Sequence, residues 1–147
     1  MTLDQHGKDL LAVCEGIKLK PYLCSAGKPT IGIGSTFYEN GSPVKLSDKP
    51  ITIERAWELF EATKIHYDKA IKDVIKVPLK QQQYNALFCF AYNVGPTGFK
   101  TSELVRKVNA HTGDVAGITQ AFHNWDGKND ILLSRRTKEV NEYFRNV

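Results

Sequence analysis

The spacing of apolar positions along the chain separates long helical stretches from one strand-rich stretch. Between residues 52 and 75 apolar side chains recur at helical spacing, with Glu54 in the first turn and Pro78 beyond the end. A helix of that length would extend on the order of 36 Å and could bridge two lobes. Residues 84–95, YNALFCFAYNVG, are apolar on nearly every side, which predicts the buried centre of a helical lobe.

A first helix is predicted over residues 2–15, because Thr2 can cap its start and Gly16 can end it. Glu15 would then lie at the C-terminal edge of that helix. Shorter helices are predicted further along the chain. Their ranges are 102–110, 114–125 and 133–144.

The stretch from Lys18 to Leu46 has a different pattern, in which short extended pieces alternate with glycine and proline. Within it, GKPTIGIGSTF at residues 27–37 alternates glycine with isoleucine. This pattern predicts a small antiparallel sheet with hairpin turns. Glycines 32 and 34 can serve a bend in the sheet, and they can also let the backbone approach a ligand closely.

Together these elements predict an α+β fold in a single domain over residues 1–147. The expected order is a small β-containing lobe at about 16–50, a connecting helix at about 52–76 and an all-helical lobe at about 77–147. The first helix is expected to pack on the helical lobe. A chain of this length with 41% hydrophobic residues can bury one core.

Composition narrows the classes of partner. Twenty Lys and Arg against sixteen Asp and Glu give a net charge of +4, a mild excess that does not indicate nucleic-acid binding. It suits an anionic polymer or an envelope surface. The three cysteines, Cys14, Cys24 and Cys89, are unevenly spaced, so neither a disulfide scaffold nor a metal site is expected, and no cofactor is implied.

The N-terminal residues lack both a basic region and a long apolar core. We therefore expect neither a signal peptide nor a membrane anchor, and no stable membrane insertion. The protein is expected to stay in the cytoplasm of the cell that makes it until something releases it.

The candidate chemistry lies where the first helix meets the glycine-rich hairpin. Cleavage of a glycosidic bond needs one carboxylic acid to protonate the leaving oxygen and a second polar group on the other face of the sugar. Glu15, at a helix end beside a hairpin, is suited to the first role. Taken alone, such a glutamate is more often a solvated side chain.

The run EGIKLKPYLCSAGKPTIGIG resembles the signature of the phage endolysin lysozymes of glycoside hydrolase family 24. That signature is Glu, eight residues, Asp or Cys, five residues and Thr, followed at once by an Ile-Gly-Ile-Gly hairpin, and Glu15, Cys24 and Thr30 match it. QQYNALFCFAYNVG resembles the buried helix of the family, and LLSRRTKEVNEYF resembles its C-terminal helix. The similarity extends over most of the chain.

The resemblance implies that Glu15 is the general acid and that Thr30 helps to position a water molecule. Cys24 occupies a position that is Asp in many relatives, and it would orient the attacking water or stabilise positive charge. An electrostatic role requires the thiolate, and an unperturbed cysteine with a pKa near 8.5 is mostly a thiol at neutral pH.

The resemblance also implies substrate-binding or orienting roles for Gly34, Asn93 and one arginine of the pair Arg135 and Arg136. Arg136 is favoured to pair with Glu15, because Val140 and Phe144 then share an apolar helix face. An ordinary polar residue at a helix end is the alternative reading of Asn93.

The implied activity is that of an inverting muramidase that hydrolyses the β-1,4 bond between N-acetylmuramic acid and N-acetylglucosamine in bacterial peptidoglycan. Such an enzyme would be a monomer that lyses the host cell wall for phage release and depends on a holin to reach it. Two alternatives remain. One is a non-catalytic wall-binding or inhibitory module, and the other is a cysteine hydrolase that uses Cys24 and would need a histidine beside it in space.

Overall fold

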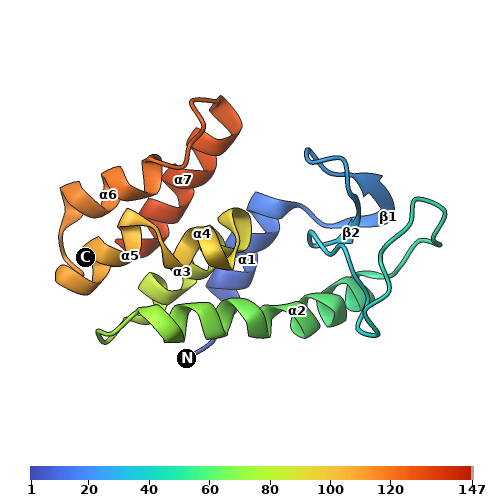
Figure 1. The fold of residues 1–147 in the computed structure, drawn as a ribbon, viewed down its shortest axis with the longest axis horizontal. Helices are drawn as coiled ribbons and strands as arrows, with labels where there is room; N and C mark the ends of the chain where they lie inside the picture. Colours follow the sequence, from blue (N-terminus) through green and yellow to red (C-terminus); the bar gives the residue numbers. More distant parts are fainter. Residues whose placement is uncertain (147) are drawn as a thin grey trace. The chain divides into compact units, whose positions relative to one another are not determined.

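A computed structural model describes residues 1–146, and residue 147, at which the predicted domain ends, lies outside the described residues. The chain forms two compact units (Figure 1). Leu11–Ile65 makes up the hairpin unit, and Met1–Leu10 together with the chain from His66 onward makes up the helical unit. Helix α1 (Gln5–Glu15) and helix α2 (Ile53–Val74) each continue from one unit into the other. The assignment of a single domain stays a prediction.

The predicted α+β class is confirmed, with a sheet smaller than expected. In the hairpin unit β1 (Lys18–Leu23) and β2 (Pro29–Gly32) pair antiparallel, with Tyr22 opposite Thr30 and an irregularity between Lys18 and Tyr22. Beyond Gly32 the predicted sheet is reduced to isolated bridges, Ile31 to Ser35 and Phe37 to Pro43. The reason is that glycines with positive φ turn the chain back after only four residues of β2.

The alternation of glycine and isoleucine at residues 31–34 forms a tight turn packed on a helix. Ile31 and Ser35 exchange two backbone hydrogen bonds of 2.9 Å, while Gly32 and Gly34 have φ of 68° and 74°. A Cβ at Gly32 would lie 3.3 Å from the Cβ of Ala56 on α2. Ile31 and Ile33, which alternate with these glycines, are fully buried. Glycine therefore serves both the backbone conformation and the close approach to α2.

The long loop between β2 and α2 is held by polar contacts within the hairpin unit. The Tyr38 hydroxyl donates to Asp48 Oδ2 at 2.6 Å, and burial together with this carboxylate raises the pKa of Tyr38 to about 12. Arg55 donates to both carboxylate oxygens of Glu39. Beneath the loop lies a small apolar core, formed by Ile31, Val44 and Leu59.

The helical unit is built around α3 (Gln81–Val94), which packs against α7 (Asp130–Tyr143) and α4 (Pro96–Lys100). Every residue of α3 from Gln83 to Ala91 is buried, which confirms the predicted buried helix. The two remaining helices of the described chain are α5 (Glu103–Ala110) and α6 (Val115–His123). They contact each other, and α6 also contacts α7.

Helix α4 is missing from the sequence prediction. Pro96, two residues beyond the end of α3, begins this helix. Proline suits the first position of a helix because its φ is already helical and its missing N–H is not needed there. Gly95, with φ of 88°, separates the two helices.

Capping residues explain the other differences at helix starts. Asp4, and not Thr2, accepts the backbone N–H of Gly7 at 3.0 Å, so α1 begins at Gln5. Asn129 accepts the N–H of Leu132 at 2.9 Å, so α7 begins three residues earlier than predicted. A side-chain acceptor satisfies a backbone N–H of the first turn and thereby marks where the helix begins.

Ser102 and Asp114 cap the two short helices in the same way and therefore precede them. The long helix was predicted at 52–75 and spans Ile53–Val74. Among the described residues, no helix combines the length and apolar character needed to cross a bilayer.

Candidate active site

Glu15 is the last residue of α1, as the sequence predicts. Gly16 ends the helix with φ of 73° and donates its N–H to the carbonyl of Ala12 at 2.8 Å. The Glu15 side chain is partly exposed, and β1 begins three residues later at Lys18. The helix end thus holds a carboxyl group close in sequence to the first strand of the hairpin.

Cys24 opens the turn that joins β1 to β2. Its N–H donates to the carbonyl of Lys28 at 3.0 Å, and its carbonyl accepts from Gly27 at 2.8 Å. The backbone N–H groups of Lys28 and Ala26 and the hydroxyl of Thr30 hold the pKa of the Cys24 thiol below its ordinary value, against an opposing effect of burial. The turn therefore presents several donors to a partly exposed sulfur and favours the thiolate.

Thr30 lies in β2 and is only 2% exposed. Its hydroxyl donates to the carbonyl of Lys28 at 2.9 Å, and it also interacts with Cys24. A hydroxyl carries one proton, so it bonds either the carbonyl or the sulfur at any moment. The pairing of β1 with β2 thus brings two of the predicted residues, Cys24 and Thr30, together.

Tyr22 is a residue of this site that sequence reasoning missed. It lies opposite Thr30 in the sheet, and the Lys18 ammonium lies 4.3 Å from the centre of its ring. Burial raises the pKa of Tyr22, and the charges of Glu15 and Cys24 raise it further. Both of these groups therefore lie near the phenol. The signal in the sequence was proximity along the chain, because Tyr22 precedes Cys24 by only two positions.

Gly34 belongs to the same unit and sits at the tight turn between Ile31 and Ser35. Its φ of 74° lies in a region that other residues rarely adopt. The backbone conformation accounts for a glycine at this position.

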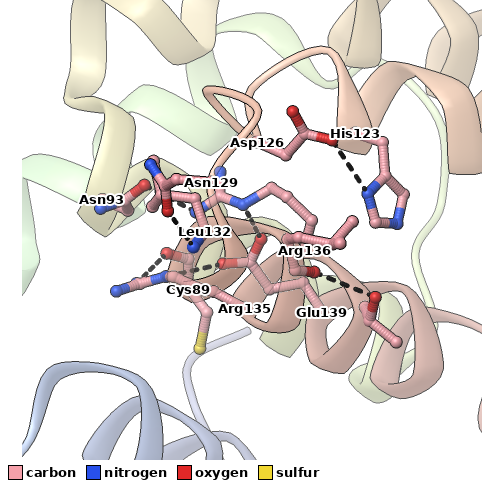
Figure 2. Close-up of polar contacts among 11 residues, drawn as sticks. Cys89, Asn93, His123, Asp126, Asn129, Leu132, Arg135, Arg136 and Glu139 are labelled. Atoms are coloured by element: carbon pink, nitrogen blue, oxygen red, sulfur yellow. Dashed lines mark hydrogen bonds and ion pairs between the residues drawn. The ribbon is translucent and has the colours of Figure 1, made fainter.

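The helical unit brings together two other predicted residues, Asn93 and Arg136. Figure 2 shows the Arg136 guanidinium directed at Asn93, whose Oδ1 accepts from Nη2 at 2.6 Å. The Nε of Arg136 lies 3.0 Å from Glu139 Oε1, and its Cζ lies 5.0 Å from the centre of the Phe90 ring. Arg136 is fully buried.

Glu139 joins both arginines of the pair. Arg135 Nε lies 3.1 Å from Glu139 Oε2, and its Nη2 donates to the carbonyl of Cys89 at 2.8 Å (Figure 2). The carboxylate is completely buried, so this is an ion cluster inside the helical unit. The spacing RRxxE on one helix carried the signal for Glu139, because residues three and four apart are neighbours. The pairing of Arg136 with Glu15 stays a prediction.

No group of three or more His, Cys, Asp or Glu side chains suited to hold a metal ion occurs in the part of the chain that the structure describes. The polar groups that the hairpin unit gathers are a carboxyl (Glu15), a thiol (Cys24), a threonine hydroxyl (Thr30) and a phenol (Tyr22), all of them groups that can donate or accept a proton.

Known proteins are similar to this chain in sequence and in fold. The family model described as phage lysozyme matches residues 12–139. The endolysin of Salmonella phage P22 is 37% identical over 142 residues, 95% of each chain. The endolysin from Escherichia coli O157:H7 phage FAHEc1 superposes with a TM-score of 0.89 at 34% identity, over 100% of this chain and 96% of that one. The muramidase domain of SpmX from Asticaccaulis excentricus gives a TM-score of 0.81 at 26% identity, over 97% of both chains.

Proposed function

The chain belongs to the phage lysozyme family, and on that premise we propose that it is an endolysin that hydrolyses bacterial peptidoglycan. Its reaction is that of a muramidase, cleavage of the β-1,4 bond between N-acetylmuramic acid and N-acetylglucosamine. The observation that carries this proposal is the family match across residues 12–139, a range that includes Glu15, Cys24 and Thr30. All three residues belong to the hairpin unit.

Glu15 is the general acid in this proposal. It gives its proton to the glycosidic oxygen as the bond to the anomeric carbon breaks, so the leaving sugar departs as an alcohol. Water attacks the same carbon from the opposite face, which inverts the configuration. The partly exposed position at the end of α1 lets solvent return a proton to Glu15 after each cycle.

Cys24 and Thr30 bind and activate the attacking water. The thiolate accepts a hydrogen bond from the water and takes its proton as the new C–O bond forms, and the Thr30 hydroxyl helps to orient the same water. The lowered pKa of Cys24 supports this assignment, because a thiolate can accept a proton where a thiol cannot. A thiolate carries the same charge as the aspartate found at this position in many relatives.

Gly34, Asn93 and Arg136 have supporting roles. The backbone at Gly34 approaches the sugar, and Asn93 contacts the substrate while Arg136 fixes its amide through the 2.6 Å hydrogen bond. Arg136 further orients Glu15. The enzyme acts as a monomer, remains in the host cytoplasm until a holin opens a route, and then reaches the cell wall.

Mass spectrometry of muropeptides after digestion of purified peptidoglycan tests the reaction. A reducing muramic acid end is expected, whereas an anhydro end would identify a lytic transglycosylase. Binding to peptidoglycan without new ends would favour a wall-binding module instead. Proton NMR of the first product formed reports the anomeric configuration, and a retained configuration would exclude the inverting route.

A further inference from the structure

Tyr22 lies among the proposed catalytic residues, and none of the roles above uses it. Its partner across the sheet is Thr30. Side chains directly opposite on antiparallel strands share a face, with Cβ atoms about 5 Å apart. The phenol therefore stands on the same face of the hairpin as the threonine proposed to orient the attacking water.

The ring of Tyr22 is held from one side. The Lys18 ammonium lies 4.3 Å from the ring centre, within the range of a cation–π contact. This contact restricts the ring orientation, and the pairing of Tyr22 with Thr30 anchors the backbone beneath it. A held ring can present its hydroxyl to a ligand with little loss of conformational freedom.

The hydroxyl of Tyr22 differs from those of three other tyrosines. Tyr38 donates to Asp48, Tyr84 to Asp68 and Tyr143 to the carbonyl of Thr112. Within residues 1–146 the Tyr22 hydroxyl has no hydrogen-bond partner, although the side chain is only partly exposed. Such a hydroxyl is satisfied by water or by a ligand.

The Tyr22 phenol lies close to Glu15 and Cys24, the two residues proposed to transfer protons. Their charges, after the larger effect of burial, raise the pKa of Tyr22 above its ordinary value. The phenol therefore keeps its proton near neutral pH and acts as a donor. A sugar bound against Glu15 and Cys24 offers hydroxyl, ring and N-acetyl oxygens as acceptors at the same place.

We propose that Tyr22 is a substrate-contacting residue of the muramidase site, whose hydroxyl donates a hydrogen bond to an oxygen of the bound sugar while Lys18 holds the ring. This inference rests on the proposed function. It adds a specificity contact to the hairpin face of the site, and this contact belongs to binding, whereas Glu15 and Cys24 carry the proton transfers.

The test compares Tyr22→Phe with Tyr38→Phe, since each removes one tyrosine hydroxyl from the hairpin unit. With soluble peptidoglycan chains as substrate, Tyr22→Phe is expected to lower kcat/KM roughly five- to tenfold, mainly through KM, with an unchanged Tm. Tyr38→Phe is expected to lower Tm, because it breaks the hydrogen bond to Asp48, and to leave kcat/KM as in the parent. Equal kcat/KM for Tyr22→Phe and the parent overturns the inference.

A binding measurement separates this inference from the proposed function. Calorimetry with the same soluble chains compares Glu15→Gln with Glu15→Gln/Tyr22→Phe, and the double variant is expected to bind roughly five- to tenfold more weakly. Weaker binding without hydrolysis by the parent would support the Tyr22 contact and refute the muramidase assignment. Equal binding, alongside hydrolysis that depends on Glu15, would refute the contact and leave the function standing.

Discussion

The hairpin unit and the helical unit each gather charged and polar side chains, and they do so in opposite ways. In the hairpin unit Glu15 and Cys24 are partly exposed and are held by backbone turns. In the helical unit Arg136 and Glu139 are fully buried and are held by each other. The first arrangement leaves acid–base groups open to a ligand, whereas the second excludes water and fixes α7 against α3.

This contrast shows that burial separates charged groups that stabilise the fold from charged groups that are available for catalysis. A buried ion pair is expensive to break, because the remaining charge loses its partner without gaining water. A partly exposed carboxyl or thiol can lose its function with little effect on folding. Substitutions in the hairpin unit should therefore change activity, and substitutions in the ion cluster should change stability.

The largest expected effect is on activity at Glu15. Glu15→Gln keeps the shape of the side chain and removes the proton donor, so the rate should fall roughly 10²- to 10⁴-fold. The measurement is loss of turbidity of permeabilised Gram-negative cells, with Tm as the control for folding. Clearing as fast as that of the parent protein would show that Glu15 is not the general acid.

The largest expected effect on stability is at Glu139. Glu139→Gln leaves the buried arginines without their carboxylate and should lower the free energy of unfolding by about 3–5 kcal/mol. Denaturant titration measures it. The matched control is Glu58→Gln, since Glu58 is 64% exposed and pairs with Arg55 at 3.1 Å, and its loss should lower stability by less than about 1 kcal/mol. Similar losses for the two variants would contradict the contrast between the units.

Substitutions at position 24 test whether a negative charge is required there. Cys24→Asp should keep substantial activity because it retains an anion, while Cys24→Leu should lose most of it. Turbidity loss measures both rates, and the Tm values of the two variants show whether either one is unfolded. If both variants clear cells at the same rate, position 24 has no part in the mechanism.

Thr30 has a smaller expected effect. Thr30→Val removes the hydroxyl at nearly constant volume, so activity should fall about tenfold, consistent with the loss of about one hydrogen bond. Thr30→Ser should keep most of the activity. The rate of alkylation by iodoacetamide against pH gives a second readout, since the pKa of Cys24 should rise without this donor. An unchanged alkylation profile would place the hydroxyl away from the sulfur.

The smallest expected effect is the pH dependence of stability. Because folding lowers the pKa of Cys24, its thiolate contributes stability above the unfolded pKa, near 8.5, and this contribution is lost as the pH falls through the folded value. The difference in free energy of unfolding between the parent and Cys24→Ser should therefore grow from about pH 6 to about pH 9. A constant difference would mean that the turn does not favour the thiolate.

Much of the fold could be predicted because it depends on strong local patterns in the sequence. The continuous apolar run of α3 and the periodic stretch of α2 indicated their helices, and Gly16 marked the end of α1 behind Glu15. The helix starts were predicted less well, because a single side-chain acceptor such as Asn129 decides where a first turn begins. Helix α4 was missed because Pro96 stops one helix and starts another equally well.

The sequence by itself determined the family and the α+β class, and it named Glu15, Cys24 and Thr30 as candidate site residues, since each depends on residue types at fixed spacing along the chain. Only the tertiary structure decided that Tyr22 lies near Glu15 and Cys24, and that Glu139 holds both arginines. The physical reason is that strand register and buried contacts bring together residues that cannot be identified as partners from their spacing along the chain. The ionisation of Cys24 likewise depends on hydrogen-bond donors that only the folded turn directs at its sulfur.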